Sequence, residues 1–144
     1  NSLSYRLRTA RSPYIGHHLT KKRKYKMPIN KININEYTVE ELIQIKESAL
    51  SCGKSAALQH LEENGEDPYC GFAWVNIYGV KGSTTLGRRM KKAGFRKDYS
   101  GAYSIWNPSG LGTQSMSVKE AGAMAAAQVF KQANFQCYAG SRAD

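Results

Sequence analysis

The chain has 144 residues, of which 41% are hydrophobic, and it carries a formal net charge of +10. A chain of this length and apolar content can form one modest core but not two, so one domain plus a tail is expected. Its apolar runs are shorter than the roughly 18–20 residues that span a bilayer, so no membrane segment is expected.

The positive charge is concentrated at the N-terminus. Residues 1–26 contain eight cations and no acid, whereas the rest of the chain has a net charge of +2. This composition cannot supply a core, so residues 1–26 are predicted to be disordered or to become ordered only on a partner. They belong to a basic N-terminal tail that is expected to span residues 1–34. Because MPINKININ, from Met27, reads like a natural beginning, three interpretations stay open: a genuine basic arm, part of a larger chain, or an extension outside the native domain.

The cysteines indicate the redox environment. Cys52, Cys70 and Cys137 are odd in number, widely spaced and without metal-ligand spacing, so neither a zinc site nor a disulfide framework is expected. The N-terminus also lacks the apolar stretch of a secretory signal. Both observations favour a reducing compartment.

Residues 35–67 are predicted to form an acidic helical segment at the start of a single domain that spans residues 35–144. Thr38 and Glu41 have the spacing of a capping box, in which each side chain bonds the backbone of the other residue, so the helix is expected to begin at Thr38. Apolar residues then recur at helical spacing as far as the turn-forming sequence ENGEDP. Gly53 is expected to divide this segment into two helices.

The stretch GFAWVNIYG is rich in β-branched and aromatic residues and predicts a strand. Alternation along it places Ala73, Val75 and Ile77 on one face. The opposite face then carries Phe72, Trp74, Asn76 and Tyr78.

A short basic helix is predicted after this strand. Ser83 is its expected N-cap, Leu86, Met90 and Ala93 form its buried stripe, and Gly94 ends it.

The next stretch, FRKDYSGAYSIWNP, predicts a hairpin around Ser100 and Gly101. Alternation in its second strand directs Tyr103 and Ile105 toward the core and places Trp106 on the same face as the aromatic side chains of the first strand.

The sequence SVKEAGAMAAAQVFKQAN predicts a longer helix, with a second capping box at Ser117 and Glu120. Its small residues let the backbone lie close against a sheet, with Ala125, Ala126 and Val129 covering the core side chains of the strands. The sequence FQCYAGSRAD predicts a final strand.

From residue 70 to residue 144 the order is therefore strand, helix, strand, strand, helix, strand. This order predicts an α+β fold with a ferredoxin-like βαββαβ core. In that arrangement the first and third strands are central and the helices cover one face of the sheet. The aromatic side chains would then lie on the other face.

Several blocks in this region resemble a family of small uncharacterised proteins encoded by tailed bacteriophages. The blocks are GFAWVNI, KKAGFRKDYSGAYSIWNP, GTQSMSVKEAGAMAAAQVF and YAGSRAD, and the resemblance covers about residues 70–144. It implies a phage or prophage origin and a place in the host bacterial cytoplasm or in a virion. The resemblance implies no activity, cofactor or site residue.

The sequence contains few residues that could form a catalytic site. His17, His18 and His60 are the only histidines, and no Ser-His-Asp, Cys-His or metal-ligand cluster can be assembled around them. No catalytic residue, metal site or cofactor is therefore predicted. An enzyme or a small-ligand-binding protein is the third choice among the functions considered.

The stretch RRMKKAGFRK places six cations within ten positions. They are Arg88, Arg89, Lys91, Lys92, Arg96 and Lys97. Cations that face away from a core beside exposed aromatic rings are typical of nucleic-acid binding, because the cations bind phosphates and the rings stack on bases. The leading hypothesis is a non-enzymatic phage accessory protein that binds nucleic acid, preferably single-stranded, with Trp74 or Trp106 stacking on a base.

Charge polarity supports two alternatives. Residues 36–67 have a net charge of −6 and residues 81–98 a net charge of +6. The acidic helix could therefore lie across the aromatic face, neutralise part of the basic stretch and turn the aromatic rings into core. The same polarity could instead recruit an acidic protein partner or a second copy, which would make the protein a virion or host-protein interaction module.

Overall fold

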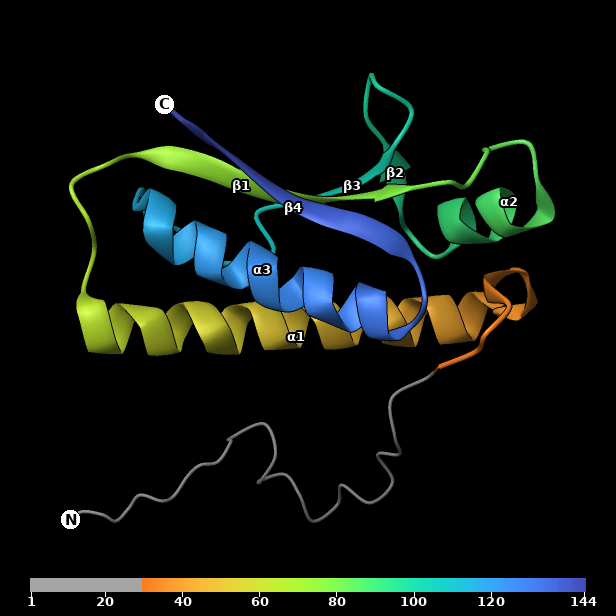
Figure 1. Ribbon diagram of the computed structural model, residues 1–144, viewed down its shortest axis with the longest axis horizontal. Helices are drawn as coiled ribbons and strands as arrows, with labels where there is room; N and C mark the ends of the chain where they lie inside the picture. The colour runs from red at the N-terminus through yellow and green to blue at the C-terminus, as the bar shows by residue number, and fades with distance from the viewer. Residues whose placement is uncertain (1–29) are drawn as a thin grey trace, which may run out of the picture.

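Figure 1 shows the computed structural model, which describes residues 30–144; the predictions for residues 1–26 therefore lie outside the described residues. Three α-helices and a four-stranded antiparallel sheet confirm the predicted α+β class. In chain order the elements are a 3-10 helix η2 (Ile34–Glu36), α1 (Val39–Asn64), β1 (Gly71–Tyr78), α2 (Thr85–Lys92), β2 (Arg96–Lys97), β3 (Tyr103–Trp106), α3 (Met116–Gln132) and β4 (Gln136–Ala143).

The sheet has the strand order β2-β3-β1-β4, and every neighbouring pair is antiparallel. The central position of β1 and β3 agrees with the prediction. Ala73, Val75 and Ile77 are buried, while the residues that alternate with them in β1 are half-buried or, at Tyr78, exposed. Trp74 lies opposite Trp106, so the two tryptophans share the face that points away from the core.

The helices lie together on one side of the sheet (Figure 1). α3 packs on β1 and β4, and α1 packs along α3. The two helices are antiparallel, since His60 near the end of α1 contacts Ser117 at the start of α3, while Tyr37 before α1 bonds Ala133 after α3. The helical layer thus consists of α1 and α3.

α2 departs from the ferredoxin-like expectation. This helix has only eight residues and packs against η2 and α1, beyond the end of the sheet at which β1 finishes (Figure 1). The helix that completes the layer beside α3 is instead α1, which precedes the βαββαβ segment. β2, with two residues, is also much shorter than β1.

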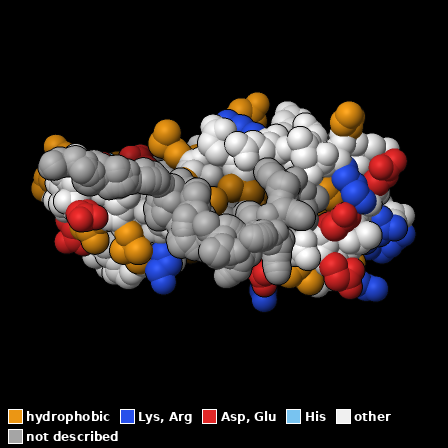
Figure 2. All heavy atoms as spheres, turned by 90° about the horizontal axis from the view of Figure 1, so that it is seen from below, with side chains coloured by type: hydrophobic (Ala, Val, Ile, Leu, Met, Phe, Trp, Pro, Cys, Tyr) orange, Lys and Arg blue, Asp and Glu red, His pale blue; other side chains and the backbone are white. Residues whose placement is uncertain are grey.

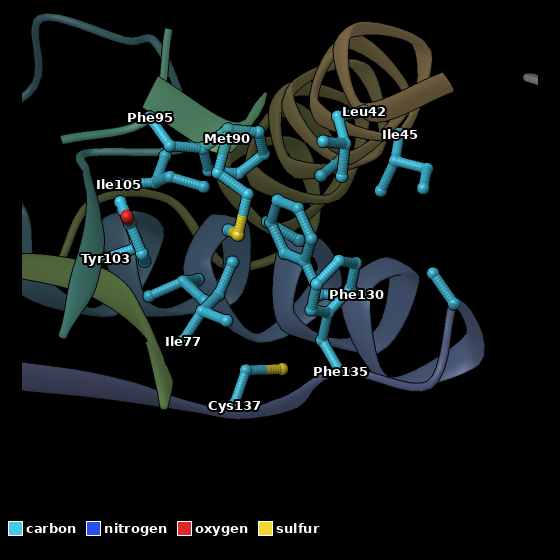
Figure 3. Packing of buried hydrophobic residues seen from close by; sticks show 14 of the residues in the cluster. Leu42, Ile45, Ile77, Met90, Phe95, Tyr103, Ile105, Phe130, Phe135 and Cys137 are labelled. Atoms are coloured by element: carbon cyan, nitrogen blue, oxygen red, sulfur yellow. The ribbon is translucent and has the colours of Figure 1, made fainter. Parts of the chain in front are cut away.

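One core lies between the sheet and the helices (Figure 3). Its largest members are aromatic: Tyr37 stacks on Phe135 with ring centroids 5.6 Å apart, and Phe130 meets both Phe135 and Phe95 edge-on. The Tyr37 hydroxyl donates to the Ala133 carbonyl at 2.7 Å. Burial raises the pKa of Tyr37, so its hydroxyl stays protonated as this donor. This bond ties the start of α1 to the end of α3.

The capping box at Thr38 and Glu41 is present, and the α2 stripe of Leu86, Met90 and Ala93 is buried as predicted. The predicted N-cap of α2 is wrong. The N-cap of α2 is Thr84 rather than its neighbour Ser83, because the Thr84 hydroxyl accepts from the Gly87 N–H at 3.0 Å.

Gly53 does not divide the acidic segment, because α1 runs unbroken through it. A Cβ atom at this position would lie 2.7 Å from the Pro108 carbonyl oxygen and 2.9 Å from the Gly122 carbonyl oxygen. Glycine is therefore explained at this position of a continuous helix, because the backbone of α1 approaches the backbones of Pro108 and Gly122 closely.

Candidate nucleic-acid interface

The sheet face that points away from the helices carries five aromatic side chains, which we call the aromatic face. They are Phe72, Trp74, Tyr78, Trp106 and Tyr138. The expectation that the acidic helix lies across this face is wrong, because α1 packs on α3 on the opposite side of the sheet. Within residues 30–144 no helix covers the aromatic face, and Trp106 is 58% exposed.

The two tryptophans form a stacked pair at the centre of the sheet. Their ring centroids lie 5.6 Å apart with an interplanar angle of 1°, and Phe72 flanks Trp106 at 5.5 Å. Gly140 of β4 lies opposite Trp74, and a Cβ there would be 2.7 Å from Trp74 Nε1. The absent side chain at Gly140 thus leaves room for the Trp74 indole to lie over β4.

A second aromatic pair lies farther along the same face. Tyr78 and Tyr138 have ring centroids 5.8 Å apart, and the Lys131 ammonium lies 6.0 Å from the Tyr138 ring. Since Tyr78 is four residues beyond Trp74 in β1, the two pairs are about 13 Å apart along the strand. The buried Asn76 Oδ1 between them has no hydrogen-bond partner among the described residues.

Strand register places two arginines on this face. Arg96 of β2 lies opposite Ser104, so its side chain shares the face of Trp106. Arg142 of β4 lies opposite Phe72, with its guanidinium carbon 5.5 Å from the Phe72 ring centroid. Arg142 was not among the predicted site residues, and only the pairing of β4 with β1 reveals its position.

The other predicted cations lie elsewhere. Lys97 is opposite Tyr103 on the helix side, where its ammonium donates to the Val80 carbonyl at 3.4 Å and lies 5.0 Å from the Tyr103 ring. Arg89 donates to the carbonyls of Asn35 and Tyr37 at 3.3 and 3.1 Å. The structure therefore brings Arg96 to the aromatic face but holds Lys97 and Arg89 against other backbone segments.

Three exposed cations remain on α2: Arg88, Lys91 and Lys92. Arg88 also donates to the Ser83 carbonyl just before the helix. Figure 2, viewed from the α1 side, shows both acidic and basic side chains at the end of the molecule where α2 lies. They are not joined by salt bridges, since the only ion pair among residues 30–144 is Lys31 with Glu41 at 3.0 Å. Neutralisation of the basic stretch by salt bridges to the acidic helix is thus not observed.

A separate polar cluster lies where α1 ends and α3 begins. Ser115 donates from its hydroxyl to Asp67 Oδ1 at 2.7 Å, and the Ser117 N–H donates to Asp67 Oδ2 at 3.2 Å. The predicted capping box at Ser117 and Glu120 is wrong, because the helix begins at Met116 and Glu120 instead accepts from the Ser141 hydroxyl. A carboxylate from a preceding loop, about 50 residues away in sequence, does the capping.

The same cluster includes His60, whose Nε2 lies 3.2 Å from Ser117 Oγ. Sequence reasoning found no partner for this histidine, since Ser117 is 57 residues away. Asp67 contacts the serines but makes no bond to His60. The arrangement is therefore accounted for by capping of α3 and by attachment of α1 to it.

Removing the Asp67 carboxylate should lower the melting temperature at neutral pH. The hydrogen bond from Ser115 is the main cause that lowers the pKa of Asp67 in the folded protein. A lowered folded pKa gives stability that is present above the unfolded pKa, near 4, and is lost as the pH falls through the folded value. The melting-temperature difference between wild type and Asp67→Ala should therefore shrink as the pH falls below about 4.

Glu62→Ala is the matched control, because it removes an exposed carboxylate from the same region. It should leave the melting temperature nearly unchanged at every pH. Equal effects of the two substitutions, measured by thermal unfolding monitored by circular dichroism, would show that the Asp67 contacts contribute nothing beyond charge.

No helix within residues 30–144 is both long enough and apolar enough to cross a membrane. In the same part of the chain no three His, Cys, Asp or Glu side chains converge as a metal site. Across the sequence and the fold, no known protein family, curated protein or solved structure matches this chain.

Proposed function

We propose that this protein binds single-stranded nucleic acid on the aromatic face, as a non-enzymatic phage accessory protein in the host cytoplasm or in a virion. The observation that carries the proposal is the Trp74–Trp106 pair, which lies on the two central strands and is not covered by α1. In this proposal the sheet acts as a ferredoxin-like platform, with the aromatic side chains of its central strands presented to bases.

The geometry suits bases rather than a flat protein partner of opposite charge. Trp106 is largely exposed, and its ring is supported by stacking on Trp74. A base that stacks on such a ring gains about 1–3 kcal/mol, and the gain tolerates any base. The tyrosine pair, about 13 Å farther along β1, offers a second stacking point. A flexible single strand can reach both, whereas the bases of a duplex are stacked on each other and inaccessible.

Phosphates would be bound at the edges of the face. Arg96 and Arg142 lie on opposite sides of the aromatic cluster, on β2 and β4. Arg88, Lys91 and Lys92 on α2 are exposed and extend the positive charge beyond the end of the sheet. They are proposed to bind phosphates without contacting bases, so they contribute affinity and salt dependence rather than sequence preference.

Fluorescence anisotropy with a labelled single-stranded oligonucleotide tests this assignment. Trp106→Ala should weaken binding by the 1–3 kcal/mol of one stacked base, which is roughly 5- to 150-fold. Tyr69→Ala is the matched control, because Tyr69 is an exposed aromatic residue in the loop between α1 and β1 and is not one of the five residues of the aromatic face. Its affinity should equal that of the wild type.

Salt dependence separates the cations of the face from those of the N-terminal region. Arg96→Ala should reduce the slope of log affinity against log salt by about 0.7, the value for one phosphate contact of a single strand. Arg88→Ala combined with Lys92→Ala should reduce it by about 1.4. Binding that ignores all these substitutions and disappears when residues 1–26 are removed would place the interaction in the basic N-terminal region and refute the proposed site.

A virion or host-protein interaction module is the second candidate. It is favoured by the opposite charges of residues 36–67 and 81–98, which are not joined by salt bridges within the described chain. This alternative predicts no measurable affinity for single strands after removal of residues 1–26. It also predicts binding to an acidic protein surface that Lys91→Glu with Lys92→Glu abolishes.

A further inference from the structure

The two edges of the sheet are built differently. β2, at one edge, has two residues, and both are cationic. Short edge strands and charged side chains are the usual means by which proteins prevent an edge from pairing with another chain. β4, at the other edge, has eight residues, and its ladder with β1 is continuous from Gln136 to Ala143. It contains no proline or lysine, and Arg142 is its only charged residue.

The outward hydrogen-bonding groups of β4 follow from the register. Asp144 N–H donates to the directly opposite Cys70 carbonyl at 2.9 Å. Because hydrogen-bonded pairs alternate along an antiparallel ladder, the even-numbered residues of β4 bond β1. The odd-numbered ones direct their N–H and C=O groups outward. Those residues are Cys137, Ala139, Ser141 and Ala143, and nothing within residues 30–144 pairs with this edge.

A shallow hollow lies beside this edge, between β4 and α3. Its lining includes Ala123, Met124 and Ala139, with Ser141 hydrogen-bonded to Glu120 at its rim. Met124 is 63% exposed although it is large and apolar. A strand added to β4 would lie over this hollow and cover the Met124 side chain. The edge thus offers both backbone hydrogen bonds and apolar contact to an incoming strand.

We propose that β4 pairs antiparallel with β4 of a second copy, which joins the two sheets into one. When Gly140 lies opposite Gly140 of the second copy, every residue from Cys137 to Ala143 has a partner, so the strand is complementary to itself. It places Tyr138 opposite Arg142 of the second copy, a cation–π pair. No two like charges face each other, because Arg142 is the only charge on the strand. Two-fold dimers are the commonest homo-oligomers.

The small side chains on the helix side permit this approach. Ala139 would lie opposite Ser141 of the second copy, so no bulky group separates the two α3 helices at this point. An edge contact of this size falls among the smaller interfaces, below about 1,200 Å², so the dimer should dissociate on dilution. The pairing does not require that the aromatic face bind nucleic acid, although Tyr138 and Arg142 belong to both proposed surfaces.

Sedimentation velocity of the full chain over about a hundredfold range of concentration tests the pairing. The sedimentation coefficient should rise from that of a monomer to that of a dimer. Ala139→Pro should keep the protein monomeric, because it removes an outward N–H without affecting the bonds to β1. Ser141→Lys should have the same effect, because a lysine on an edge strand opposes pairing with another chain. Ser51→Lys, which adds the same charge at an exposed position of α1, should still dimerise.

Hydrogen exchange locates the contact. The amides of Ala139 and Ser141 should be protected only in concentrated samples, whereas those of Tyr138 and Gly140 should be protected at every concentration, since they bond β1. A chain that stays monomeric throughout would overturn the proposal. So would a dimer that forms equally in both edge variants, or one in which the Ala139 and Ser141 amides exchange freely. If Ala139→Pro does not fold, Ser141→Lys decides.

Discussion

Replacing Gly53 with alanine is expected to destabilise the protein by about 1–3 kcal/mol, the usual cost of overpacking a tight contact. Helix propensity alone predicts the opposite sign, a gain of about 1 kcal/mol, because glycine is a poor residue in a helix interior. The contact should prevail because both neighbouring atoms, the carbonyl oxygens of Pro108 and Gly122, belong to the backbone. A side chain could rotate away, but these atoms move only if α1 shifts relative to α3 and to the loop after β3.

Ser51→Ala is the matched control for this prediction. Ser51 is exposed, lies two residues earlier in α1, and is also replaced with alanine. It should stabilise the protein by about 0.5 kcal/mol through helix propensity. Urea unfolding of the two variants measures both effects. A gain in stability from Gly53→Ala would show that α1 does not approach Pro108 and Gly122 as closely as the structure has it.

Replacing Ala126 with leucine is expected to lower the free energy of unfolding by about 1–3 kcal/mol. Ala126 is fully buried in α3, and it belongs to the same core cluster as Val75, Ile77 and Phe130. A leucine at this position needs room for three more carbon atoms in a core that is already filled. Since leucine and alanine are both good helix formers, the loss would report packing rather than the stability of the isolated helix.

Ala125→Leu provides the comparison. Ala125 is the preceding residue of the same helix and is only half-buried, so a leucine there can extend partly into solvent. It should cost clearly less than Ala126→Leu in the same urea titration. Equal costs at the two positions would mean that α3 is rotated relative to its observed orientation on the sheet.

The candidate site was only partly predictable. Alternation along β1 and β3 predicts that Trp74 and Trp106 share a face, because successive side chains of any strand point to opposite sides. The contribution of Arg142 was not predictable, since it depends on which residue of β4 lies opposite Phe72. The six clustered cations suggested one patch. The structure separates them, because β2 carries Arg96 onto the aromatic face while Arg89 is held by carbonyls before α1.

The sequence by itself determined what short-range physics controls. The capping box at Thr38, the buried stripe of α2 and the alternation of β1 all depend on residues within a few positions of one another. The order of strands and helices from residue 70 onward follows from the same local patterns. The central position of β1 and β3 was expected from the ferredoxin-like arrangement that this order indicates.

Only the tertiary structure decided where the acidic helix packs. The apolar stripe of α1 matches either side of the sheet equally well by pattern, and its position against α3 is set by close backbone contacts at Gly53 and Gly122. The capping of α3 by Asp67 could not be predicted from the sequence either, because Asp67 and Ser117 lie about 50 residues apart. Local periodicity shows which side of an element is apolar. It does not show which other element covers that side, because the outcome depends on shape complementarity between segments that are distant in sequence.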